Sequence, residues 1–197
     1  MPIIAPLQDD EIEPALLEQF EKLKGPLGEV PNSVRTMARR PEIARTFVAL
    51  NQAVMRCEGA LTPEFKRIIA YVASFASGCR YCQAHTILAS ERFGASDARL
   101  DSVYDYADSP HFSDAEKAAL DFAHAAAQVP NDVTKAHGAA LRAHWSEADI
   151  VEIMGVVALF GFLNRWNDSM GTALEDLPTE AAERLLGPSG WDAGKHG

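Results

Sequence analysis

Apolar residues recur every three or four positions along most of the chain, which is the spacing of one face of an α-helix. The clearest stripes cover residues 12–23, 43–54, 65–76 and 150–160. We find no run of β-branched residues that alternates strictly with polar ones, as a half-buried strand would. The pattern therefore predicts an all-α fold.

Capping and breaking residues divide this pattern into separate helices. Gly25-Pro26 should end the first stripe, because a Gly-Pro pair cannot continue a helix. Thr62 and Pro63 should open a later helix, as a hydroxyl cap followed by a first-turn proline. The tail from Pro178 is expected to form a last short helix and a surface arm.

Two segments share a layout that suggests a repeated helical hairpin. Each has a hydroxyl cap, Thr62 or Ser146, then an apolar helix and a zone that contains a glycine, Gly78 or Gly161, before a second polar-marked stretch. The second helix should pass Asn164 and Asp168 and end before Gly171. The match lies in layout more than in identities. We predict a single domain, residues 1–197, built as a helical bundle with a weak internal repeat of this hairpin.

Composition narrows the classes of partner. The 197 residues are 47% hydrophobic and 23% charged, enough for one compact core without a disulfide framework or a structural metal. The formal charge of −10, from 28 acidic and 18 basic residues, argues against nucleic acid and anionic lipid as partners. No apolar run approaches the ~20 residues of a membrane span. The N-terminal segment lacks the basic and apolar regions of a secretion signal, so we expect a cytoplasmic protein.

One cluster points to chemistry: Cys79 and Cys82 form a C-x-x-C motif, and His85 follows three residues later. Residues three apart on a helix lie nearly on one face, so the two sulfurs can approach one another and Cys82 can approach the imidazole. In a reducing cytoplasm this motif indicates redox chemistry more often than structure. A helix start, the neighbouring Arg80 and a histidine base should all favour the thiolate of Cys82.

The cysteines and histidines also allow roles other than redox chemistry. Cys57 stands alone and is expected to be a buried packing residue. Zinc could bind Cys79, Cys82 and His85 with one more histidine. The candidates for that fourth ligand are His111, His124, His137 and His144. Structural zinc usually takes ligand pairs separated by a loop, so we expect no metal and no bound cofactor.

The sequence resembles the carboxymuconolactone decarboxylase family, particularly its alkylhydroperoxidase-like, peroxidase-related branch. The resemblance covers most of the chain and rests on residues 30–32, 40–42, 78–86 and 146–168, of which 78–86 are the most specific. It implies an all-α fold around a helical hairpin and homo-oligomers such as trimers or hexamers. In members with C-x-x-C it also implies thiol-dependent reduction of hydroperoxides.

Residue by residue, the resemblance makes Cys82 the peroxide-attacking thiol, Cys79 the resolving thiol and His85 part of a proton relay. The family's relay glutamate usually lies about a dozen residues before the first cysteine. Arg67 stands at that position here, and Glu64, one turn earlier, is the acid that could replace it. The alkylhydroperoxidase pattern also has its histidine one residue later, where this chain has a threonine.

Three functions follow from these observations. The first is a thiol-dependent peroxidase that reduces a small-molecule hydroperoxide and is recycled by an external thiol reductant or redox protein. The second is a decarboxylase or isomerase acting on a small lactone or acid, with His85 as the general acid or base. The third is a redox-sensing oligomer that assembles through the apolar segment 153–166.

Overall fold

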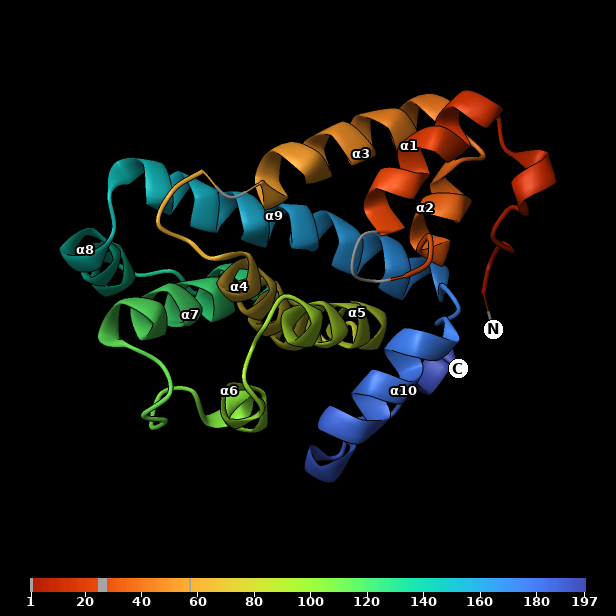
Figure 1. Ribbon diagram of the computed structural model, residues 1–197. Coiled ribbons are helices and arrows are strands. Elements are labelled where there is room, and N and C mark those ends of the chain that lie inside the picture. The colour runs from red at the N-terminus through yellow and green to blue at the C-terminus, as the bar shows by residue number, and fades with distance from the viewer. Residues whose placement is uncertain (1, 25–27, 57) are drawn as a thin grey trace.

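The computed structural model describes residues 2–24, 28–56 and 58–197. Within these ranges the chain forms α-helices and short 3-10 helices and no strand, so the all-α prediction is confirmed (Figure 1). Two features discussed above, the Gly25-Pro26 breaker and Cys57, lie outside the described residues. None of the described helices is long and apolar enough to cross a membrane.

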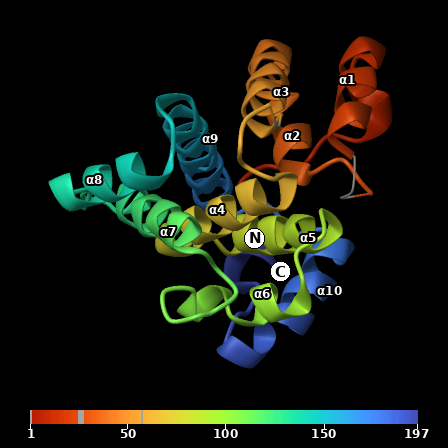
Figure 2. The ribbon, with the colours of Figure 1, turned by 60° about the vertical axis from the view of Figure 1, so that its left-hand side comes forward.

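The helices group around a long one that runs across the molecule. In chain order they are α1 (Pro14–Lys24), α2 (Asn32–Met37), α3 (Pro41–Met55), α4 (Pro63–Ala76), α5 (Arg80–Arg92), α6 (Asp97–Asp101), α7 (Asp114–Ala127), α8 (Lys135–His144), α9 (Glu147–Met170) and α10 (Asp176–Leu185). Helix α9 has α1 to α3 on one side and α4, α5 and α7 on the other (Figure 1). Helix α10 packs against α5, and the pair α1 and α3 stands away from α7 and α8 (Figure 2).

The α4–α5 hairpin carries the C-x-x-C motif, and its ends form as the sequence predicts. Thr62 Oγ1 accepts a hydrogen bond from the Phe65 N–H at 3.1 Å, and Pro63 occupies the first turn of α4. Gly78 has a φ of +73°, a left-handed conformation that glycine adopts without steric cost, and it reverses the chain. Cys79 is then the N-cap of α5. The cysteines therefore sit at a helix start.

Two predictions about the C-terminal half need correction. Helix α9 passes Gly161 and ends before Gly171, as the sequence predicts, but it is one unbroken helix, so the second segment does not repeat the α4–α5 hairpin. A single glycine costs a helix only about 1 kcal/mol, which packing of the apolar neighbours offsets. The tail is also no surface arm: Trp191 is buried, and His196 is 1% exposed with its Nδ1 2.8 Å from the Thr172 carbonyl oxygen.

Candidate active site

A cavity of about 430 Å³ lies where α1 to α3 meet α4, α5 and α9. Apolar side chains make up much of its wall, among them Val34, Phe47, Phe160 and Leu163. Cys82 also lines this cavity, whereas Cys79 is fully buried and is not among the lining residues. Of the C-x-x-C pair, Cys82 is thus the sulfur that a molecule in the cavity can meet.

The two cysteines are close neighbours and both are free thiols. The Cys82 backbone N–H donates to Cys79 Sγ at 3.5 Å, so the N-cap sulfur sits over the first turn of α5. One helical turn brings two Cα atoms to about 5 Å, within the 4.4–6.8 Å range of disulfides. The pair can therefore close a disulfide with little backbone movement.

The environment of Cys82 corrects one expectation. Burial is the main reason that the pKa of its thiol is raised well above the ordinary value, and the neighbouring Cys79 adds to the rise. The hydrogen bond from Asn167 Nδ2 to Cys82 Sγ, at 3.5 Å, acts in the opposite direction. Arg80 does not offset burial, because its guanidinium lies against Asp192 on the C-terminal segment. Burial at this position therefore disfavours the thiolate form of Cys82.

His85 belongs to a buried polar network at the same cavity. Its Nε2 lies 2.7 Å from Glu175 Oε2, and the other carboxylate oxygen accepts a hydrogen bond from the Tyr81 hydroxyl at 2.9 Å. The Asn32 N–H also donates to that oxygen, and the Ser33 N–H donates to the Tyr81 hydroxyl at 3.2 Å. The Glu175 carboxylate, just before α10, thus joins the start of α2 to the first turns of α5.

These contacts keep Glu175 ionised. Burial alone would raise its pKa, but the net direction is downward because the His85 ring, the Asn32 N–H and the Tyr81 hydroxyl all stabilise the carboxylate. Burial and the nearby Glu175 raise the pKa of Tyr81 well above the usual value, so the phenol stays neutral and donates. A carboxylate at Nε2 favours a proton on that nitrogen, and Nδ1 is then the ring nitrogen without a proton.

Glu64, the acid expected from the sequence, lies in a different ion pair. One of its oxygens accepts from Arg99 Nε at 2.8 Å, and the other lies 3.2 Å from the Thr62 hydroxyl. We therefore assign the carboxylate of the His85 network to Glu175 in place of Glu64. The sequence held no local signal for this partner, because Glu175 is 90 residues away from His85 along the chain.

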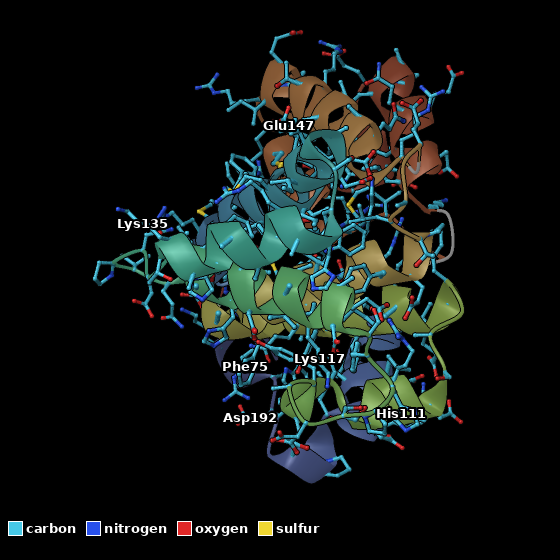
Figure 3. The ribbon with its side chains drawn as sticks, turned by 90° about the vertical axis from the view of Figure 1, so that its left-hand side faces the viewer. Phe75, His111, Lys117, Lys135, Glu147 and Asp192 are labelled. Carbon is cyan, nitrogen blue, oxygen red and sulfur yellow. The ribbon has the colours of Figure 1, made fainter. Side chains whose placement is uncertain are left out.

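The donors considered for zinc do not converge. In the described part of the chain, no three side chains among His, Cys, Asp and Glu are grouped so that they could hold a metal ion. His111, for example, is exposed at the edge of the molecule beside α6 (Figure 3). His85 instead pairs with a carboxylate. The arrangement is that of two thiols and a histidine–carboxylate pair beside a mostly apolar cavity.

Comparisons with known proteins agree with this fold. The sequence model of the carboxymuconolactone decarboxylase family matches residues 41–125. A solved structure of the debrominase Bmp8, a cysteine-to-alanine variant in complex with 2,3,4-tribromopyrrole, is similar with a TM-score of 0.88 and 30% identity, covering 94% of this chain and 98% of that one.

Two further relatives are peroxidase-related or of undetermined activity. The alkylhydroperoxidase AhpD core of a peroxidase-related protein from Ralstonia eutropha JMP134 superposes with a TM-score of 0.77 and 26% identity, covering 89% of this chain and 94% of that one. The Escherichia coli (strain K12) protein YnjA is 29% identical over 159 residues, 80% of this chain and 84% of YnjA.

Proposed function

We propose that this chain, which belongs to the carboxymuconolactone decarboxylase family, is a dithiol oxidoreductase that reduces an organic hydroperoxide with electrons from Cys79 and Cys82. The observation that carries the proposal is the placement of the two sulfurs. Cys82 lines a cavity large enough for a small organic molecule, and Cys79 lies directly behind it, fully buried. This division suits an attacking and a resolving thiol.

The reaction proceeds in two steps. The sulfur of Cys82 attacks the distal oxygen of the hydroperoxide as its thiol proton leaves, the O–O bond breaks, and the alkoxide leaving group takes up a proton to become an alcohol. Cys82 is then a sulfenic acid. The Cys79 thiol attacks that sulfur, water leaves, and a disulfide joins the two residues. Two electrons pass from the sulfurs to the peroxide, and an external thiol reductant or redox protein returns them.

Because the pKa of Cys82 is raised, its thiol keeps its proton, and a base must accept that proton as the sulfur attacks. His85 lines the cavity with Cys82, so its Nδ1 can take the thiol proton as the sulfur attacks and pass it to the leaving oxygen. The Glu175 carboxylate holds the opposite ring nitrogen and stabilises the imidazolium that forms. The Asn167 amide stabilises charge on the Cys82 sulfur through its Nδ2 hydrogen bond.

Peroxide consumption by cysteine variants tests this proposal. With cumene hydroperoxide as the substrate and dithiothreitol as the reductant, Cys82→Ser should abolish turnover. Cys79→Ser should allow one oxidation, trapped as a sulfenic acid that dimedone labels. Cys57→Ser is the matched control and should keep full turnover. Unchanged turnover in Cys82→Ser would exclude the proposal.

A second candidate uses the same sulfurs on a different electrophile. The likeness to a debrominase that binds 2,3,4-tribromopyrrole favours reductive removal of a halogen from a haloaromatic molecule. The cavity suits this too, since its wall is mostly apolar. One aryl–bromine bond and two thiols become an aryl–hydrogen bond, a disulfide, bromide and a proton. Bromide release from 2,3,4-tribromopyrrole, compared by kcat/KM with consumption of cumene hydroperoxide, decides between the two candidates.

The proposal also includes an external reductant and a homo-oligomeric assembly. The resting pair must be restored from outside, so turnover should depend on an added dithiol and not on a bound cofactor. We also propose a homo-oligomer, a trimer or a hexamer, which light scattering of the purified protein tests directly. A monomer of unchanged activity would remove the oligomer from the proposal without affecting the chemistry.

A further inference from the structure

The charge of the cavity differs in sign from that of the whole protein. The chain carries a formal charge of −10, with 28 acidic residues against 18 basic ones. Yet among the described residues that line the cavity are two arginines, Arg56 and Arg67, and no aspartate or glutamate. The wall of the cavity therefore carries positive charge, although the protein as a whole is negatively charged.

Arg67 is held against the cavity wall by its neighbours. Its guanidinium carbon lies 3.7 Å from the centre of the Phe93 ring, and Phe93 itself lines the cavity. Its Nη1 donates to the Pro63 carbonyl oxygen at 2.7 Å, one turn earlier on α4. A guanidinium held by stacking and hydrogen bonding loses little further freedom when it binds an anion. Its planar fork also matches the two oxygens of a carboxylate.

Arg56 adds a second positive group to the cavity wall, just after α3 ends. Its Nε forms an ion pair with Glu58 at 2.8 Å, but both side chains are more than half exposed. An exposed pair of this kind contributes about 0–1 kcal/mol, so an incoming anion can compete with Glu58 for the guanidinium. Asn51 and Gln52, one turn before the end of α3, line the cavity beside it and offer amide donors.

Much of the rest of the wall is apolar, and Cys82 lies within it. Phe47, Phe160 and Leu163 line the cavity together with Cys82. A ligand that satisfies both regions has an apolar body with one anionic end. Charge–charge attraction at a partly enclosed site is stronger than in open water, so the anionic end should orient the body in the cavity.

We infer that the substrate is an amphipathic organic anion, a carboxylate whose apolar part bears the electrophilic oxygen or halogen, and that Arg67 binds the carboxylate. This inference rests on the proposed function for the identity of the reacting sulfur. Arg67 is a specificity-determining residue here and takes no part in the redox step. The redox reaction is the same as the one proposed above, because the carboxylate is bound and released unchanged.

A matched pair of substrates tests it: cumene hydroperoxide and the same molecule with a para-carboxylate. Wild-type protein should have the higher kcat/KM for the carboxylate. Arg67→Gln should lower that value about 10- to 100-fold, the worth of a hydrogen-bonded charge pair, and should change the value for the neutral molecule by less than about twofold. Arg67→Lys should restore part of the preference. Lys135→Gln is the control for net charge, because Lys135 lies on α8 (Figure 3) and does not line the cavity.

A binding measurement separates this inference from the proposed function. Calorimetry with unreactive para-isopropylbenzoate should show binding that Arg67→Gln weakens, with para-isopropylbenzyl alcohol as the neutral comparison. If both hydroperoxides are consumed at equal kcat/KM and Arg67→Gln changes neither, the inference is overturned and the peroxidase stands. If para-isopropylbenzoate binds through Arg67 but no hydroperoxide is consumed, the anion site stands and the peroxidase is overturned. Absence of both binding and turnover overturns both.

Discussion

Replacing Glu175 with glutamine should disable the proton relay while leaving the shape of the site intact. The carboxylate receives the Tyr81 hydroxyl and the Asn32 N–H on one oxygen and faces His85 Nε2 with the other. A glutamine that keeps its carbonyl oxygen toward the first two groups must turn its NH₂ toward His85. Two donors would then face each other, so the imidazole must move its proton from Nε2 to Nδ1.

The size of the effect follows from that change of tautomer. The Nδ1 that should accept the Cys82 proton would already carry one, so general-base assistance is lost. Such assistance is worth about 10²- to 10⁴-fold in rate, equivalent to roughly 2.7–5.4 kcal/mol of transition-state stabilisation. The fold should survive, because glutamine fills the same space and keeps the hydrogen bonds to Asn32 and Tyr81.

A single-turnover assay measures this directly. Reduced protein is mixed with a limiting amount of cumene hydroperoxide, quenched at intervals, and the remaining Cys82 thiol is counted by mass spectrometry. Glu64→Gln is the matched control: it loses an ion pair with Arg99 but should oxidise at the wild-type rate. Equal rates in Glu175→Gln and wild type, or a slow Glu64→Gln, would refute the assignment of the relay.

Three further outcomes are expected. Alkylation of Cys82 by iodoacetamide should keep rising with pH beyond the ordinary cysteine range, because burial raises the pKa of this thiol, and Asn167→Leu should raise that pKa further. Lys66 is fully buried, with its Nζ 2.9 Å from the Val54 carbonyl oxygen and 3.1 Å from a Glu152 carboxylate oxygen, so Lys66→Met should lower the free energy of unfolding by about 3–5 kcal/mol in urea titrations. Burial lowers the pKa of His196 below 6.5, so the stability it contributes should be full above pH 6.5 and be lost as the pH falls through the folded-state value; His196→Phe should lack this dependence in thermal unfolding.

The features of the fold that could be predicted are those that depend on residues close together in the sequence. The start of α4 at Thr62 and Pro63 depends on a hydrogen bond and a φ angle within a few residues. The structure begins the helix where the sequence predicts. The nearness of Cys79 and Cys82 is likewise a property of one helical turn. The predicted repeat of the hairpin shows the limit of this reasoning, since the chain reverses at Gly78 but continues as one helix through Gly161.

The missed features of the site all depend on contacts between distant segments. Glu175 reaches His85 only because α10 packs against α5, and nothing in the spacing of the two residues predicts it. The sequence also predicts a stabilised thiolate at Cys82, whereas the pKa of this thiol is raised. A sequence motif shows the helix start and the nearby base but not the depth of burial. In this site burial outweighs the helix start.

The central claim is that Cys79 and Cys82 donate two electrons to a molecule bound in the cavity. The most direct measurement is peptide mapping of reduced wild-type protein after it has consumed one equivalent of hydroperoxide, without added reductant. We predict one disulfide between Cys79 and Cys82 for each hydroperoxide consumed. Consumption that leaves both thiols reduced, or that oxidises Cys82 to a sulfinic acid while Cys79 stays a thiol, would contradict the account.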